Sequence, residues 1–352
     1  MPLRIPQKRR IWIHAVLIMV LFVIGAAALN IGPLKSTWSE IGQVFKDRLF
    51  FVSAEDRIWS DPIIWNLRFP RIIMSMLVGA GLAVSGALMQ GLFRNPLADP
   101  GLIGVSSGSA MGAVIAIIVL PFLGMSGDWI MYAATPICAM VGGVGVTFLI
   151  YQLSRVGGRI NVASMLLTGI AINAIGGALI GFAVTQIATA EQLQSFTFWS
   201  LGSLNGVLWP VVGIAALVLL PGLFIAIWLG KPLNAFLFGE LEAYHLGVDV
   251  PKVKRITIVV SALMVGITVG FTGMIGFVGL VAPHIIRLSF GPDHRFLLPA
   301  SALCGAILLV IADTLARTIA APAELQIGIL TSLIGGPFFL MLLLKARKEM
   351  SI

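Results

Sequence analysis

Charged residues are scarce in this sequence. Asp, Glu, Lys and Arg make up 11% of its 352 residues, whereas a typical soluble domain carries about 25%. Hydrophobic residues make up 58%, which is more apolar surface than one buried core can hold. Most of the chain must therefore be solvated by lipid, and a soluble globular protein is excluded. The long apolar runs predict an all-α, polytopic membrane protein.

Motifs for nucleotide and metal chemistry are missing as well. No GxxxxGK[ST] phosphate loop occurs, because Gly230-Lys231 is followed by Pro232. No HExxH or CxxC occurs, and Cys138 and Cys304 lie in apolar stretches typical of packing residues. The four histidines all fall toward the predicted cytoplasmic side: His14, His245, His284 and His294. We therefore expect no catalytic residue, no cofactor and no metal site.

Acidic residues within the apolar runs are also few. Asp313 and Arg317 lie four residues apart on one predicted helix and can form an ion pair. A proton-coupled carrier usually needs a relay of buried carboxylates, and one paired aspartate offers little for that purpose. A secondary carrier acting without an ATPase is nevertheless the alternative from another class. No cluster of His, Asp and Ser at one membrane depth favours a membrane enzyme.

Ten apolar runs are long enough, or nearly so, to cross a bilayer. They lie near 12–30, 70–92, 102–121, 129–151, 162–187, 206–229, 255–272, 277–290, 298–318 and 328–344. The eighth is short, and Gly276, Gly279 and Pro283 predict a partial or bent helix there. The chain forms a single permease domain over 1–352, with possible inverted five-helix halves at about 1–200 and 201–352. It has a long periplasmic loop at 31–69 and a cytoplasmic coupling loop at 230–254.

The charge distribution orients these spans. With both termini inside, most of the 23 basic residues fall in cytoplasmic segments, among them Arg4. The net charge of +8 therefore indicates membrane topology, and we expect no nucleic-acid partner. The outer side keeps Lys35, Lys46, Arg48, Arg57, Arg68, Arg71 and Arg317, and acidic residues balance those of the long loop: Glu40, Asp47, Glu55, Asp56 and Asp61.

The most distinctive stretch runs from the second span into the third. It reads LRFPR at 67–71, GAGLAVSGALMQ at 79–90 and RNPLADPGLIGVSSG at 94–108. Asn95-Pro96 and Asp99-Pro100-Gly101 predict a tight inner turn. Small residues at every fourth position predict close helix packing along the third span, at Gly104, Gly108 and Gly112.

With these motifs the sequence resembles the FecCD family, the permease subunits of ABC importers for ferric siderophores, haem and cobalamin. The resemblance covers nearly the whole chain. Further matching segments are FWSLGS at 198–203, Gly239-Glu240 with Leu246-Gly247, GFVGLVAPHIIRL at 276–288, DHR at 293–295, Ala312-Asp313 through Arg317, and Ala323-Glu324-Leu325 with Gly328. Gln326 departs from the family, which usually has proline there.

The resemblance implies a type II ABC importer permease. Two copies form a homodimer around a translocation path in the bacterial inner (plasma) membrane. Two ATPase subunits dock on the cytoplasmic face and bind the ATP, and a periplasmic or lipid-anchored binding protein delivers cargo. The chain itself is then not an enzyme, in agreement with the missing phosphate loop.

The resemblance also implies functional residues. A short polar helix between the sixth and seventh spans is expected to contact the ATPase through Glu240, Tyr244, His245 and Leu246. Arg68, Arg71 and Arg317 match positions that pair with acidic residues of the binding protein. The alternatives are headgroup anchoring for Arg68 and Arg71 and the Asp313 ion pair for Arg317. The inner gate is expected at Asn95, Pro96, Leu97, Val162 and Ala163.

The sequence identifies the cargo less specifically than it identifies the family. The run QLQSFTFWSLGS at 192–203 most resembles haem permeases. Haem is flat, apolar and dianionic, and a path of apolar and small residues without tight ligands suits its release. Haem is therefore the favoured cargo, with a ferric siderophore and then cobalamin as alternatives.

Overall fold

The computed structural model describes residues 6–32, 34, 36–53, 58–125, 128–156 and 159–350. Five charged residues discussed above lie outside these ranges: Arg4, Lys35, Glu55, Asp56 and Arg57. The long helices are α1 (Gln7–Asn30), α3 (Phe69–Phe93), α4 (Val105–Val114), α6 (Asp128–Leu153), α7 (Val162–Gln186), α9 (Trp209–Phe236), α11 (Val250–Thr272), α12 (Val278–Phe290), α13 (His294–Ile319) and α14 (Ile327–Met350).

Short elements connect these helices. They are α2 (Trp38–Leu49), α5 (Leu120–Phe122), α8 (Ala190–Ser200), α10 (Glu240–His245), the π-helical turns η2 (Pro62–Arg68) and η4 (Ile115–Val119), the 3₁₀ turn η3 (Pro100–Ile103), and a two-stranded hairpin, β1 (Arg155–Val156) with β2 (Arg159–Ile160). The predicted 31–69 loop contains α2, whose N-cap Thr37 and Glu40 form a reciprocal capping box.

All ten predicted spans correspond to helices. Within the described residues, eight are long and apolar enough to cross a membrane, and α12 and the Ile327–Met341 part of α14 are shorter apolar helices. The prediction of a short eighth span is confirmed, since α12 has 13 residues and contains Pro283. The second span begins earlier than predicted, because η2 continues into α3 from Pro62.

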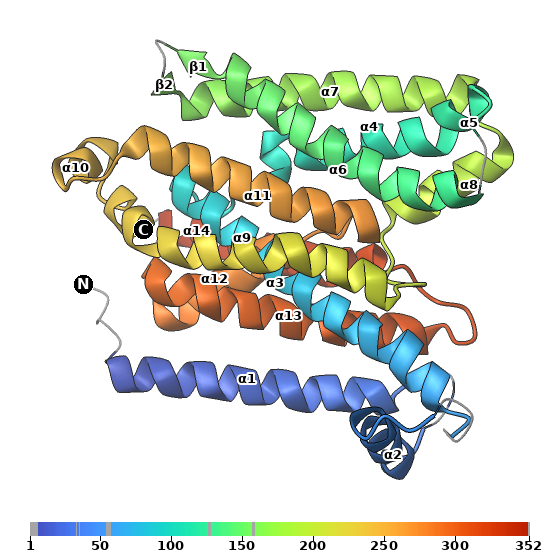
Figure 1. Cartoon of the computed structure of the whole chain (residues 1–352). Coiled ribbons are helices and arrows are strands. Elements are labelled where there is room, and N and C mark those ends of the chain that lie inside the picture. The colour runs from blue at the N-terminus through green and yellow to red at the C-terminus, as the bar shows by residue number, and fades with distance from the viewer. Residues whose placement is uncertain are drawn as a thin grey trace.

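The elements divide between the two ends of the bundle. The N-terminal end of α1, the C-terminal end of α14, α10 and the β1–β2 hairpin lie at one end, and α2, α5 and α8 lie at the other (Figure 1). We call these the inner and outer ends, following the charge bias of the sequence. The first helix therefore begins, and the last helix ends, on the same side of the bundle, as an even number of crossings requires (Figure 1).

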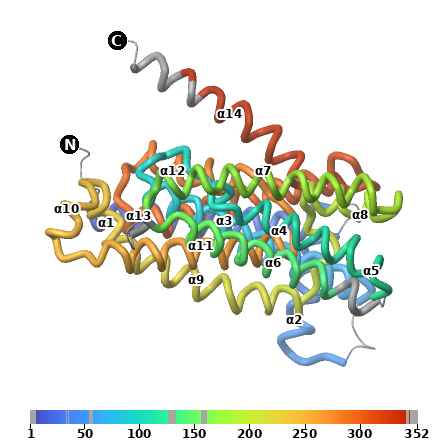
Figure 2. The backbone as a smooth tube through the Cα atoms, turned by 90° about the horizontal axis from the view of Figure 1, so that it is seen from above, coloured from blue at the N-terminus to red at the C-terminus, as the bar shows by residue number. Residues whose placement is uncertain are grey.

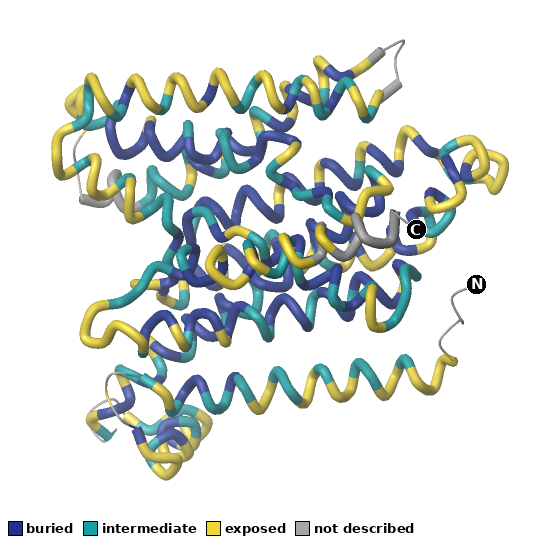
Figure 3. Tube along the Cα trace, turned by 180° about the vertical axis from the view of Figure 1, so that it is seen from behind, coloured by how far each residue is buried: buried dark blue, intermediate teal, exposed yellow. Residues whose placement is uncertain are grey.

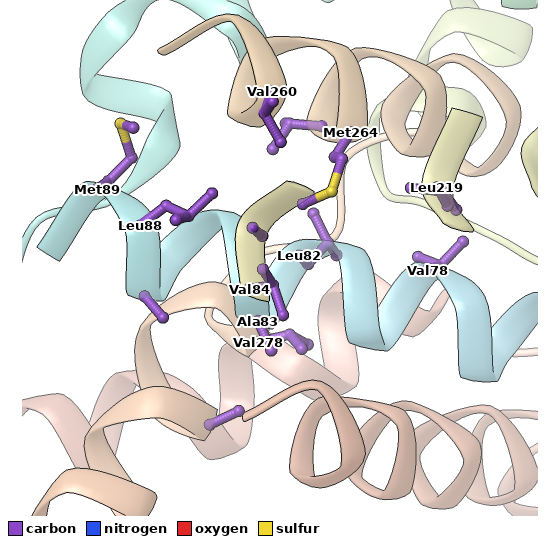
Figure 4. Packing of buried hydrophobic residues seen from close by; sticks show 14 of the residues in the cluster. Val78, Leu82, Ala83, Val84, Leu88, Met89, Leu219, Val260, Met264 and Val278 are labelled. Atoms are coloured by element: carbon purple, nitrogen blue, oxygen red, sulfur yellow. The ribbon is translucent and has the colours of Figure 1, made fainter. Parts of the chain in front are cut away.

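Helix α3 forms the centre of the bundle. In an apolar 18-residue window of Pro62–Phe93, 83% of the residues are buried, and α3 packs against α9, α11, α12 and α13. Its apolar side chains meet Leu219 of α9, Met264 of α11 and Val278 of α12 (Figure 4). Burial falls off outward, so that α1 and α7 have few buried residues (Figure 3). Helix α14 leaves the bundle at an angle (Figure 2).

Small residues allow the central helices to touch backbone to backbone. A methyl group on Gly86 of α3 would overlap the carbonyl oxygen of Gly279 in α12. The predicted stripe on the third span is confirmed: Gly108 faces the Gly142 carbonyl and Gly112 faces that of Cys138, both in α6. Such contacts matter in lipid, where association depends on van der Waals fit.

Adding one methyl group tests this packing. We expect Gly86→Ala to destabilise the bundle by about 2 kcal/mol, because α3 and α12 must separate to admit the methyl group. The measurement is thermal unfolding of the purified protein in detergent. Gly213→Ala on α9 is the matched control, since no heavy atom lies within 4 Å of the added carbon. Equal melting temperatures for the two variants would contradict the packing role.

Candidate functional site

Arg71 is the centre of an ion-pair cluster at the outer end. It lies in the first turn of α3, and its Nε donates to Asp313 Oδ1 of α13 at 2.9 Å, while Nη2 lies 2.8 Å from the same oxygen. Its Nη1 donates to both Glu324 oxygens at 3.0 Å. Asp313 is fully buried, whereas the Glu324 side chain is 30% exposed. The cluster therefore ties α3 to α13 and to the segment that follows α13.

Arg68 and Arg317 flank this cluster but have a different kind of partner. Arg68 Nη1 donates to the Leu29 carbonyl oxygen at 2.7 Å and to Ser36 Oγ at 3.0 Å, and Nη2 donates to the Leu34 carbonyl oxygen. Arg317 donates to the carbonyl oxygen of Ala28. All of these acceptors are neutral. The carbonyls of Ala28 and Leu29 belong to the last turn of α1, where backbone C=O groups lack helical partners, so the two arginines cap that end of the helix.

A pocket brings the three predicted docking arginines together. It has a volume of about 210 Å³ and also contains Glu324 in its wall, next to the 204–207 turn. The three side chains are buried, which argues against lipid-headgroup anchoring of Arg68 and Arg71. Asp313 forms its direct ion pair with Arg71 of α3 and not with Arg317 of its own helix, although Arg317 remains close enough to attract it. Sequence spacing on one helix could not show that competition.

Helix α10 lies at the inner end of the bundle (Figure 1). Ala243 is buried against the bundle, while Tyr244 and Leu246 are each 67% exposed, and His245 is also exposed. Glu240 has a different role, since its carboxylate lies 2.7 Å from Lys254 Nζ of α11. Of the four predicted coupling residues, three therefore face outward and one fixes the helix to the bundle.

The predicted gate turn directly follows α3. Arg94 adopts a left-handed conformation at the end of the helix, with φ of 51°. Asn95 Oδ1 then accepts a hydrogen bond from the Leu97 N–H at 2.9 Å, which confirms the tight turn. Asn95 and Pro96 are exposed in the isolated chain, as is Ala163 next to Val162 at the start of α7. Both predicted gate segments thus lie at helix ends and remain a prediction.

Three inner helices are joined next to the coupling loop. Asn234 of α9 accepts from the His294 N–H at 2.8 Å and donates to Asp293 Oδ1 at 2.7 Å, while Arg10 of α1 pairs with Asp293 Oδ2 at 2.7 Å. Burial would raise the pKa of Asp293, but these hydrogen bonds outweigh it and hold the pKa below its ordinary value. The end of α9, from which α10 continues, is thereby fixed to α13.

A small cavity lies deeper in the chain. It holds about 90 Å³ where the 99–101 turn meets the 274–277 segment before α12. The Asp99 carboxylate caps η3 by accepting from the Gly101 N–H at 2.7 Å. Burial raises the pKa of Asp99, and the Gly101 hydrogen bond opposes the rise. Among the described residues no group of three or more His, Cys, Asp or Glu could hold a metal ion.

The structure is thus a helical bundle with eight helices of membrane-spanning length among the described residues and exposed surfaces at both ends. The FecCD transport family matches residues 17–345, and the chain belongs to that family. The hemin transport system permease protein HmuU of Yersinia pestis is 43% identical over 336 residues, or 95% of this chain and 96% of that protein. The cobalamin import system permease protein BtuC of Halobacterium salinarum is 42% identical and covers 80% of this chain and 73% of that protein.

A solved structure has the same architecture. It is an inward-facing conformation of a transporter assigned to the metal-chelate type of ABC transporters. The TM-score is 0.79 at 32% identity, and the match covers 96% of this chain and 99% of that one. The ten-helix permease architecture predicted from the sequence is therefore confirmed.

Removing the buried carboxylate tests the outer cluster. We expect Asp313→Asn to lower the free energy of unfolding by about 3 kcal/mol, because Arg71 then keeps only its partly exposed partner. Thermal unfolding in detergent is the measurement. Thr314→Val, a neighbouring position at which the hydroxyl bonds only to its own helix, is the control. A melting temperature unchanged by Asp313→Asn would contradict the structural role of the pair.

Proposed function

We propose that this chain is the permease subunit of an ABC importer that moves haem across the inner membrane. The observation that carries the proposal is the near full-length match to a hemin permease, at 43% identity. The chain binds no ATP of its own and needs no cofactor; a separate ATPase subunit supplies the energy. A substrate-binding protein delivers the cargo to the outer end.

The cargo assignment has chemical support in the region that follows α7. Helix α8 presents Leu193 and Phe198 beside Gln194. Apolar and amide groups suit the faces and edges of haem without holding its iron. The match to a cobalamin permease keeps cobalamin, and with it ferric siderophores, as the second candidate within the same family.

A second copy of the chain is expected to cover α7 and α14. In an apolar 18-residue window of α7 only 17% of the residues are buried, and the exposed surface includes Gly177 and Gly181, which have no heavy atom near them. Large apolar side chains such as Leu179 and Phe182 are exposed on the same helix. Small residues within an exposed apolar surface favour close contact with another helix. The homodimer would place Asn95–Leu97 and Val162–Ala163 around a shared path, as an inner gate requires.

The exposed side of α10 fits the ATPase subunit. Tyr244 and Leu246 form an apolar surface together with Leu241, at the end of the bundle that the charge bias assigns to the cytoplasm. Aromatic and aliphatic side chains at a protein interface contribute more binding energy than polar ones at its rim. The joint through Asn234 and Asp293 would carry force from α10 into the bundle.

Truncating the α10 surface tests the coupling role. We expect Tyr244→Ala combined with Leu246→Ala to weaken ATPase binding roughly tenfold and to leave the melting temperature unchanged, because both side chains are exposed. Co-purification and titration with the cognate ATPase measure the loss. Leu49→Ala on α2, an exposed apolar position at the opposite end with no assigned role, is the control. Normal ATPase affinity in the double variant would contradict the assignment.

The cargo is tested in proteoliposomes that contain the permease, its ATPase and its binding protein. We expect haem to stimulate ATP hydrolysis and to accumulate inside the vesicles, whereas ferric siderophores and cobalamin at the same concentration do neither. Omitting the ATPase controls for a secondary carrier, which would transport on an ion gradient alone. Stimulation by a siderophore or cobalamin and not by haem would overturn the haem assignment.

A further inference from the structure

Arg71 is almost fully engaged before any partner arrives. A guanidinium has five N–H donors. In Arg71, Nε donates to Asp313 and Nη2 lies 2.8 Å from the same carboxylate, while Nη1 donates to the two oxygens of Glu324. Each of its three nitrogens therefore already faces an internal carboxylate. A carboxylate of a docking protein therefore cannot form a two-point contact with Arg71 unless an internal acceptor leaves.

The two internal carboxylates differ in how easily they can leave. Asp313 lies within α13 and is 1% exposed, so that its removal from Arg71 would leave a buried charge unpaired. Glu324 is 30% exposed, lies in the segment between α13 and α14, and lines the pocket wall. Water can solvate the Glu324 carboxylate as soon as it swings outward. Glu324 is thus the replaceable partner.

Arg68 and Arg317 are not occupied in this way. Arg68 donates to oxygens of Leu29, Ser36 and Leu34, and Arg317 donates to the carbonyl oxygen of Ala28, all of them neutral acceptors. The three arginines face two carboxylates, Asp313 and Glu324, so the cluster keeps one positive charge in excess, and Glu324 is the more exposed of the two carboxylates. The pocket therefore attracts an anion, although the Arg71 guanidinium at its centre already has carboxylate partners.

We propose that Glu324 is an internal stand-in for a carboxylate of the substrate-binding protein, and that docking exchanges the one for the other on Arg71. The inference rests on the proposed role of this pocket in docking. It makes Glu324 a regulatory residue, because every docking event must displace it. Binding is then weaker and more readily reversed than the three arginines alone would give, as an importer that repeatedly loads and releases its binding protein requires.

Neutralising Glu324 separates this exchange from ordinary docking. We expect Glu324→Gln to tighten the Kd for the cognate binding protein roughly fivefold, the effect of removing one partly exposed competing ion pair. Glu324→Asp, which keeps the carboxylate, should bind nearly as the unaltered chain does. The measurement uses the full transporter in lipid nanodiscs and biolayer interferometry at two salt concentrations, and the gain should shrink at the higher one.

The matched control is Glu191→Gln on α8, which removes an exposed negative charge from the same end of the bundle. It should leave the Kd unchanged, so a general charge effect would appear as equal gains in both variants and would overturn the proposal. An unchanged or weaker Kd for Glu324→Gln, in a variant with an unaltered melting temperature, would overturn it as well.

Arg68→Gln distinguishes a failure of the exchange from a failure of the docking site. If Arg68→Gln weakens binding while Glu324→Gln does not tighten it, docking at the pocket stands and the exchange is wrong. If Arg68→Gln binds normally and remains folded by its melting temperature, the binding protein docks elsewhere and both proposals fall.

Discussion

The structure depends on how closely α3 can approach its neighbours in lipid. Between helices in a bilayer there is no hydrophobic driving force, so that association rests on van der Waals contact and on a few polar bonds. Gly79 and Gly86 bring the backbone of α3 against α13 and α12. That contact sets the position of Arg71 relative to Asp313 at one end and of the 94–97 turn at the other.

Polar groups are concentrated where this packing ends. At the outer end, buried arginines close the last turn of α1 and join α3 to α13. At the inner end, Asn234 and Asp293 join α9, α13 and α1. The bundle interior between them is held mainly by apolar contact, which suits a subunit whose helices must shift against one another during transport.

Much of the fold follows from the sequence because lipid imposes simple rules. The lengths of the apolar runs predicted the ten helices. The interruptions at Gly276, Gly279 and Pro283 predicted the short α12. The glycine stripe on the third span predicted a close helix contact, which α4 makes with α6. The ion pairs were not predictable in the same way. Asp313 is four residues from Arg317 in the sequence, yet its direct ion pair is with Arg71 of α3, a helix distant in sequence but packed against α13. In the sequence, Glu324 is recognisable only as part of a motif that matches the family. Its ion pair with Arg71 depends on the packing of the helices, which the sequence does not show.

Helix α13 connects the two ends of the molecule as one element. Its first residue, His294, is bonded to Asn234 beside the coupling loop, and Asp313 and Arg317 lie near its other end. At 1.5 Å per residue its 26 residues span roughly 39 Å, about the thickness of a bilayer. Because α13 is one continuous helix, a change of its tilt at the inner joint also moves its outer end. A tilt of about four degrees about His294 would displace Asp313, roughly 28 Å further along the helix, by about 2 Å, enough to lengthen a hydrogen bond beyond its useful range.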